Sequence, residues 1–201
     1  MKMLMQVFAG LPLVLLLNGC AASQAVMPSK NYIVLVGHGM PATDYPKDRL
    51  GEFFRMHTHE HSDGRAQFPG ARNEVTERDR EIREWSRTPE NDPYKVGVDT
   101  IAELLRRRTG HPVLVAFYEF CAPTVEQAVD RAVEGGAERI VVITTMVTPG
   151  GDHSEVDIPK SIEAARQRHP NTPIVYAWPY DTDLLADMFA DQVNAFEANR
   201  R

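Results

Sequence analysis

Four short apolar runs, separated by stretches with helical spacing, constrain the fold of this chain more than any other feature. The runs lie at Tyr32–Val36, Pro112–Phe120, Arg139–Val147 and Pro173–Trp178. Such unbroken runs are typical of strands that are buried on both faces of a parallel sheet. The chain is therefore expected to place four parallel strands in one sheet.

Helices are predicted in the segments that follow these runs. Apolar residues recur three and four positions apart over 98–105, 125–133 and 184–196, which is the spacing of one helix face. A further helix is predicted over Pro159–Arg168, because a proline is tolerated in a first helical turn. A strand–helix repeat connects parallel strands by right-handed crossovers, so helices cover both faces of the sheet. We therefore expect a small doubly wound, flavodoxin-like α/β fold.

Three polar side chains stand where these strands end. His38 follows the first run between two glycines, Glu119 ends the second, and His153 follows the third after Pro149-Gly150-Gly151-Asp152. A lone histidine is more often structural than a ligand. In doubly wound sheets, however, ligands bind beyond the carboxyl ends of the strands. Two imidazoles and a carboxylate that converge there predict a site for a divalent first-row metal ion.

Residues 40–92 do not fit the strand–helix repeat and are predicted to be an insertion. Short helices are expected over Asp48–His57 and over Glu74–Trp85, the second of them strongly charged and solvated. An excursion of this length in a small domain is usually functional or disordered. Because the insertion starts at the strand end that carries His38, we expect it to overhang the site.

The insertion contains three histidines within five residues, His57, His59 and His61. On a helix His57 and His61 share one face, whereas on a strand all three do. Either arrangement suits an accessory site for Zn²⁺, Co²⁺ or Ni²⁺, as a capture arm or as further ligands of the main site. The alternative is a solvated polar loop.

The N-terminus has the pattern of an export signal. Lys2 precedes the apolar run Val7–Leu17, which is too short for a helix that spans a bilayer, since such a helix needs about 20 residues. The segment LNGC that ends at Cys20 resembles a bacterial lipobox, which implies cleavage before Cys20 and a lipid on its thiol. The alternative is an ordinary signal peptide with an incidental cysteine.

This signal sets the expected domain organisation and location. The ranges are 1–19 for a lipoprotein signal peptide, 20–30 for a tether, and 31–201 for one domain with the insertion at 40–92. The protein is then an extracytoplasmic lipoprotein held to the membrane on the periplasmic side. Because no aspartate follows Cys20, the outer membrane is the preferred position.

Charge, cysteine content and motifs exclude several classes of protein. The 22 Lys and Arg residues against 28 Asp and Glu residues give a net charge of -6, which argues against a nucleic-acid partner. Two cysteines exclude a disulfide-dense scaffold and a cluster of four thiolates. Neither GxGxxG nor GxxxxGK[ST] occurs, so no nucleotide cofactor is expected, and GxSxG is absent too.

Four segments carry a resemblance to one known family. They are VLVGHG at 34–39, FYEFCAPTVEQAV at 117–129, VTPGGDHSEVDIPKSI at 147–162 and PYDTDLLADMF at 179–189. In order and spacing they resemble the sirohydrochlorin chelatase family of the short CbiX/SirB type. The resemblance implies a chelatase-like fold and an enzyme, a lyase that inserts Co²⁺ or Fe²⁺ into a sirohydrochlorin-like tetrapyrrole without ATP.

The resemblance also implies roles for individual residues and an assembly. The two metal-binding histidines of the family fall on His38 and His153, and its acidic residue falls on Glu119, so these three are the expected catalytic and metal-binding residues. Short members of the family resemble half of a two-lobed chelatase and pair as homodimers. Without its signal and insertion, this chain has the size of such a half, and we expect a homodimer.

The chain departs from the family pattern in three ways. Its loop after the first strand, Gly37 to Pro41, lacks the polar and basic residues of the family's GHGSR-like loop. The insertion and the export signal are atypical as well, since siroheme and cobalamin synthesis is cytosolic. These departures favour an alternative function, a non-catalytic extracytoplasmic carrier of metal or tetrapyrrole. A metal-dependent hydrolase is the least favoured alternative.

Two features next to the expected site have alternative interpretations. Cys121 lies two residues past Glu119 and is either a further ligand or a small buried thiol. Asp152 and Asp157 flank His153, and one of them either orients its imidazole or caps the following helix.

Overall fold

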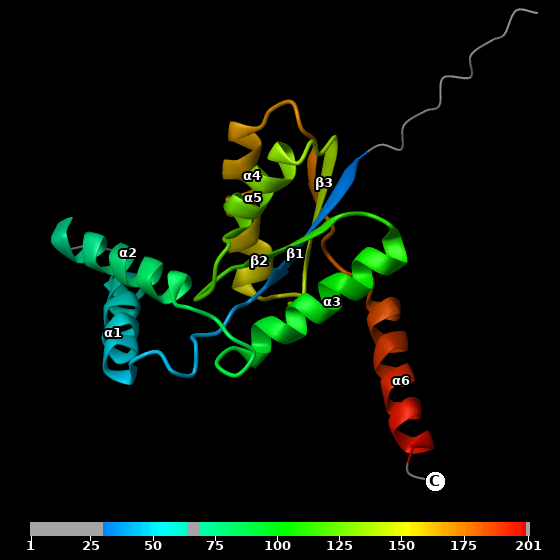
Figure 1. Ribbon diagram of the computed structural model, residues 1–201, viewed down its shortest axis with the longest axis horizontal. Coiled ribbons are helices and arrows are strands. Elements are labelled where there is room, and N and C mark those ends of the chain that lie inside the picture. Colours follow the sequence, from blue (N-terminus) through cyan, green and yellow to red (C-terminus); the bar gives the residue numbers. More distant parts are fainter. Residues whose placement is uncertain (1–29, 64–68, 200–201) are drawn as a thin grey trace, which may run out of the picture.

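The computed structural model describes residues 30–63 and 69–199, and it leaves the side chains of 57–63 and 69–75 undescribed. The strands are β1 (Asn31–Gly37), β2 (Val113–Phe117), β3 (Arg139–Thr144) and β4 (Ile174–Tyr176). The helices are α1 (Lys47–Asp63), α2 (Pro69–Glu84), α3 (Pro93–Thr109), α4 (Val125–Glu134), the π-helical turn η1 (His153–Asp157), α5 (Ile158–Arg168) and α6 (Thr182–Ala198). Figure 1 shows a central sheet with helices around it and two helical projections.

The sheet is parallel and four-stranded, in the order β2-β1-β3-β4, which confirms the predicted α/β fold class. Val34 of β1 lies opposite Leu114 of β2 on one side and Val142 of β3 on the other. The chain moves outward from β1 to β2 and then returns to the other side of β1 for β3. Strand order therefore reverses at β1, which makes the carboxyl ends of the central strands the place for a site.

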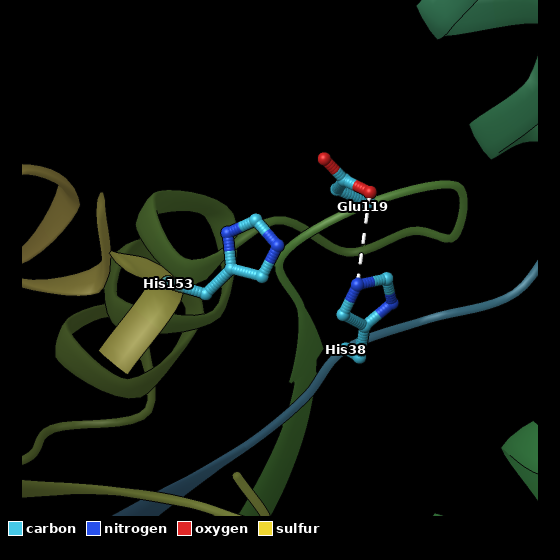
Figure 2. Close-up of side chains that lie close together, drawn as sticks. All are labelled: His38, Glu119 and His153. Atoms are coloured by element: carbon cyan, nitrogen blue, oxygen red, sulfur yellow. Dashed lines mark ion pairs between the residues drawn. The ribbon is translucent and has the colours of Figure 1, made fainter. Parts of the chain in front are cut away.

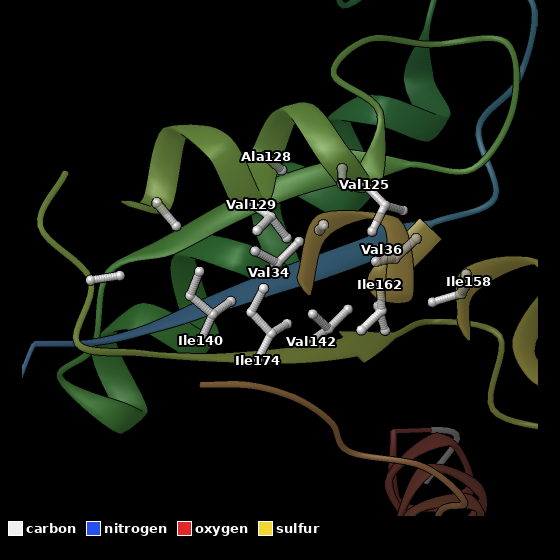
Figure 3. Packing of buried hydrophobic residues seen from close by; sticks show 14 residues of the cluster. Val34, Val36, Val125, Ala128, Val129, Ile140, Val142, Ile158, Ile162 and Ile174 are labelled. Carbon is white, nitrogen blue, oxygen red and sulfur yellow. The ribbon is translucent and has the colours of Figure 1, made fainter. Parts of the chain in front are cut away.

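One face of the sheet is covered by α4 and α5. Side chains from this face, among them Val34, Val36, Ile140 and Val142, form a buried cluster with both helices (Figure 3). The start of α4 is held by a capping box, in which Thr124 and Gln127 each bond the backbone of the other. This face is the main hydrophobic core.

Among the described helices, only α3 covers the opposite face. Val98 and Ala102 of α3 pack against Leu35 and Phe117 of the first two strands. On the far side of this face, Val141, Ile143 and Val175 are only partly buried. The sheet therefore has one well-covered face and one half-covered face.

The insertion folds as the hairpin of α1 and α2, which projects from the carboxyl end of the sheet (Figure 1). Both helices are longer than predicted, and α2 begins with Pro69, whose missing N–H does not matter in a first turn. The second helix is strongly charged, as predicted, but it is not solvated on all sides, because Ile82 is fully buried against Phe53 and Phe120. The insertion thus has a small core of its own, and this core includes a residue next to Glu119.

The last helix, α6, leaves the sheet and projects away from it (Figure 1). The expected apolar stripe is present, but no residue of α6 is buried. Its large apolar side chains, Leu184, Met188, Phe189, Val193 and Phe196, are between 50% and 66% exposed. Helical spacing predicted the helix correctly and did not say what would cover its stripe. Among the described residues, no helix is both long and apolar enough to span a bilayer.

Candidate metal centre

His38, Glu119 and His153 meet at the carboxyl ends of the strands (Figure 2). One ligand atom from each lies within 4.8 Å of the others. Nε2 of His38 is 3.8 Å from Oε2 of Glu119, and the two imidazole centroids are 5.2 Å apart. In the part of the chain that the structure describes, this is the only group of three such side chains close enough to share a metal ion.

The loops that carry His38 and Glu119 continue the pairing of β1 and β2. The N–H of Tyr118 donates to the Gly37 carbonyl over 3.0 Å, and that of Glu119 donates to the His38 carbonyl over 2.8 Å. The strand β2 nevertheless ends at Phe117 and not at Phe120 as predicted, because the chain bends from residue 118 onward. This bend turns the Glu119 carboxylate toward the imidazole of His38.

The tautomer of His38 is determined by its neighbour in the chain. Its Nδ1 lies 2.8 Å from the carbonyl oxygen of Gly39. A carbonyl can only accept a hydrogen bond, so Nδ1 carries a proton, and in the neutral imidazole Nε2 keeps its lone pair. Nε2 is also the atom that faces Glu119. The imidazole therefore presents a metal-binding lone pair toward the centre of the cluster.

The tautomer of His153 is determined in the same way, in this case by a carboxylate. It opens the π-helical turn η1, a geometry often found at functional sites, and its Nδ1 lies 3.0 Å from Oδ2 of Asp157. Because the carboxylate accepts the Nδ1 proton, Nε2 of His153 is free for a metal ion. Burial acts to raise the pKa of Asp157, but hydrogen bonds from His153 and Tyr118 outweigh burial and hold that pKa below its ordinary value. The Asp157 carboxylate is thus kept charged beside the imidazole.

These contacts decide between the alternatives for the aspartates that flank His153. Asp157, and not Asp152, orients the imidazole. Asp157 also stands at the N-cap of α5, but its side chain makes no capping hydrogen bond there. Orientation of His153 is therefore the role that the geometry supports.

Two tyrosines that no sequence pattern marked support the metal centre. The hydroxyl of Tyr94, 56 residues away in the chain, accepts the backbone N–H of His38 over 3.0 Å. The ring of Tyr118 lies 4.3 Å from that of His153 between centroids. Burial, together with the nearby Asp157 carboxylate, raises the pKa of Tyr118 above its ordinary value. The phenol therefore stays protonated and acts as a neutral wall behind His153.

Cys121 is not part of the cluster. It is buried, its Sγ lies 3.9 Å from Oδ2 of Asp92, and burial raises the pKa of its thiol. A thiol has to lose its proton to bind a metal ion, so this environment opposes ligation. The interpretation as a small buried thiol is the one that fits.

Two further predicted sites stay predictions. His57, His59 and His61 fall within α1, so the helical arrangement applies, in which His57 and His61 share one face. The structure does not describe their side chains. Cys20 lies outside the described residues altogether.

The cluster is accessible and incompletely enclosed. The side chains of His38 and His153 are 35% and 36% exposed, and that of Glu119 is 23% exposed. Structural metal sites are closed by four protein ligands, whereas sites that exchange or act on a metal ion keep a position open. Two neutral nitrogens and one carboxylate, open on one side, suit an ion that must be passed on.

Replacing Asp157 by alanine should weaken Co²⁺ binding by roughly 10–100-fold, the usual effect of losing a partner that orients a ligand. The imidazole of His153 remains but loses the acceptor that selects its tautomer. Titration calorimetry with Co²⁺ measures the effect. Asp152→Ala is the matched control, because it removes a carboxylate adjacent to His153 that makes no bond to the imidazole. Equal affinities of the two variants would contradict the orienting role.

The model of the CbiX family matches residues 88–195, just over half of the chain. A sirohydrochlorin ferrochelatase from Priestia megaterium is 30% identical over 81 residues, which are 40% of this chain and 30% of that protein. A sirohydrochlorin cobaltochelatase from the same organism is 40% identical over 67 residues, which are 33% of this chain and 22% of that protein. The matched segments therefore span less than a third of either relative.

A solved structure resembles this chain over most of its length. The crystal structure of a CbiX protein from Marinobacter aquaeolei VT8 has a TM-score of 0.46 and 19% sequence identity, and the match covers 85% of this chain and 99% of that chain.

Proposed function

The chain belongs to the CbiX family, and from this premise we propose that it inserts a divalent metal ion, Co²⁺ or Fe²⁺, into a sirohydrochlorin-like tetrapyrrole without ATP. Relatives named as sirohydrochlorin ferrochelatase and cobaltochelatase support this substrate class. The observation that carries the proposal is the convergence of His38, Glu119 and His153, whose ligand atoms lie within 4.8 Å of one another.

The chemistry of insertion matches what these side chains offer. The ion has to lose water, and two pyrrole N–H protons have to leave the macrocycle as its nitrogens bind the metal. His38 and His153 each offer a neutral Nε2, and Glu119 offers a negative charge against the doubly charged ion. When the metal moves to the pyrrole nitrogens, these groups are released and accept the two protons. No nucleotide is needed, because metal–nitrogen bonds replace those to the protein.

Apolar surface beside the cluster supports a flat aromatic substrate. The ring centroid of Phe120 is 6.1 Å from that of His38, and Phe54 of α1 is 5.9 Å from Phe120. Phe54 is 44% exposed and Met40 is 48% exposed, although both are large apolar side chains. Exposed apolar groups next to a polar cluster are typical of ligand sites. We infer that one face of the macrocycle lies against this surface.

An insertion assay tests the proposed function. The full chain in detergent is mixed with sirohydrochlorin and Co²⁺ or Fe²⁺, and metallation is followed by the change in macrocycle absorbance. We expect a rate well above that without protein. Metal binding without any acceleration would instead support the carrier alternative, and no metal binding at all would reject both.

We further propose that the chain forms a homodimer, with α6 in the interface. The apolar stripe of α6 is exposed along its length, and contiguous exposed apolar surface usually marks an interaction site. The half-covered face of the sheet, with Ile143 and Val175 partly buried, is a second uncovered apolar surface. A second copy brings the same two surfaces, so a symmetric pair can cover all of them at once.

Replacing Phe189 by aspartate should convert the dimer into a monomer, because a charge in an apolar interface has no partner. Light scattering after size-exclusion chromatography gives the mass directly. Asp187→Ala changes the polar face of the same helix and should leave the dimer intact. A monomeric wild-type chain would reject the proposed assembly.

The lipid anchor also belongs to the proposal. The lipobox-like segment that ends at Cys20 supports an extracytoplasmic protein held to the membrane on the periplasmic side. Growth with labelled fatty acid tests this, since a Cys20→Ser variant should lose label that the wild type incorporates. Equal labelling of the two would reject the anchor.

A further inference from the structure

We propose that Arg87 is a positioning residue that joins the two loops of the metal centre and thereby sets the distance between His38 and Glu119. Arg87 follows α2, at the end of the inserted segment, and touches neither side chain directly. The inference rests on the proposed metal-binding role of the cluster. It assigns a function to an insertion that the family pattern does not explain.

The guanidinium of Arg87 contacts both loops at once. Its Nη1 donates to the carbonyl of Met40, in the loop that carries His38, over 2.8 Å. Its Nη2 donates to the carbonyl of Phe120, the residue that follows Glu119. Nη2 also donates to the carbonyl of Ile82 at the end of α2 over 2.9 Å. One side chain therefore connects the first loop, the second loop and the inserted hairpin.

A buried ion pair holds this guanidinium in place. Nη1 of Arg87 lies 2.9 Å from Oδ2 of Asp92, and the two side chains are only 10% and 2% exposed. The other oxygen of Asp92 accepts the N–H of Lys95 over 2.9 Å at the start of α3. Because α3 packs on the sheet itself, Asp92 connects Arg87 to a helix that is anchored on the sheet.

A second arginine holds the rest of the Glu119 loop. Arg83 of α2 donates to the carbonyl of Tyr118 over 2.7 Å and to that of Cys121 over 3.1 Å. The two guanidinium groups thus bind the carbonyls on either side of Glu119. In this loop, Phe120 has a φ of 56°, which a residue other than glycine rarely adopts. A backbone in this region persists only where its surroundings hold it, and the two arginines supply that support.

The arrangement requires the planar fork of an arginine. A guanidinium presents five N–H groups in fixed directions and can serve several acceptors at once, whereas the ammonium of a lysine is a compact point charge on a flexible stem. Arg87→Lys therefore keeps the positive charge for Asp92 but cannot bridge Met40 and Phe120. This separates the positioning role from simple charge balance.

The test measures Co²⁺ affinity of the full chain in detergent, with every metal-binding side chain intact. We expect Arg87→Lys to bind Co²⁺ roughly 10–100-fold more weakly, as when a partner that orients a ligand is lost. The visible spectrum of bound Co²⁺ should change as well, because the ligand geometry changes. Arg166→Lys is the matched control, since Arg166 donates to the Ile174 carbonyl on β4, away from the cluster. It should bind Co²⁺ with wild-type affinity and spectrum.

A second variant and a second measurement cover a failure of folding or of metal binding. If Arg87→Lys does not fold, Arg83→Lys tests the same loop with the Arg87–Asp92 pair intact, and wild-type affinity and spectrum would then overturn the proposal. In the metal-free protein, either variant should speed amide exchange in 117–121 relative to Arg166→Lys, and unchanged exchange would also overturn it. A wild-type chain that binds no Co²⁺ rejects the proposed function, and the exchange comparison then decides the role of Arg87 separately.

Discussion

Replacing His38 or His153 by alanine is expected to weaken Co²⁺ binding by about 100-fold or more, a larger loss than removal of an orienting partner causes. Each change removes an Nε2 lone pair whose direction the structure sets through a contact at Nδ1. Metal insertion should fall with binding, because the ion has to be held while the pyrrole protons leave. Titration calorimetry and the absorbance assay measure the two quantities separately.

The matched control for these variants is His111→Ala. His111 lies just before β2, at the amino ends of the strands, whereas the cluster lies at their carboxyl ends. The His111→Ala variant should bind Co²⁺ and accelerate insertion like the wild type. Wild-type affinity in His38→Ala and in His153→Ala would show that the metal binds elsewhere, and His57, His59 and His61 would then be the remaining predicted ligands.

Replacing Gly39 by alanine should disrupt both the fold and the centre. Gly39 has a φ of 94°, and an added Cβ would lie 1.9 Å from the carbonyl oxygen of Glu119. The backbone conformation alone costs about 1–3 kcal/mol for a residue with a side chain. The overlap adds to this cost, because it can be relieved only by moving the His38 and Glu119 loops apart. We expect a loss of roughly 3 kcal/mol or more, which lowers Tm by about 6–12 °C, together with weaker Co²⁺ binding.

Gly110→Ala separates the cost of a positive φ from the cost of the overlap with a neighbouring loop. Gly110 also has a positive φ, 72°, at the end of α3, but an added Cβ would meet no atom within 4 Å. Its substitution should cost only about 1 kcal/mol and leave Co²⁺ affinity unchanged. Thermal and urea unfolding compare the two variants. If Gly39→Ala were no more destabilising than Gly110→Ala, the two loops would not be in contact in solution.

Local sequence patterns were sufficient for most of the sheet and for the convergence of the three polar residues. The run that became β1 is apolar because both faces of this strand are covered, whereas the run that became β3 has only one well-covered face. Once the strands are parallel, their carboxyl ends share one edge, and because β1 and β2 are adjacent in the sheet His38 and Glu119 lie close together.

The same patterns failed where an apolar residue is buried by something other than the sheet. The run Pro112–Phe120 continues past the end of β2 because Phe120 packs under the inserted hairpin, against Phe53 and Ile82. An apolar side chain has the same sequence signature whatever covers it. The stripe of α6 shows the converse, since its apolar periodicity is not accompanied by burial in the part of the chain that the structure describes.

The sequence by itself determined the succession of strands and helices along the chain, and with it the edge of the sheet where two imidazoles and a carboxylate meet. That is because backbone preference and apolar periodicity act between neighbours in the chain. Only the tertiary structure decided which nitrogen of each imidazole is free, that Asp157 and not Asp152 orients His153, and that Arg87 joins the two loops. The role of Arg87 depends on hydrogen bonds to residues that are 33 and 47 positions away in the chain. Hydrogen bonds of this kind depend on tenths of an ångström and on direction, and no pattern along the chain encodes either.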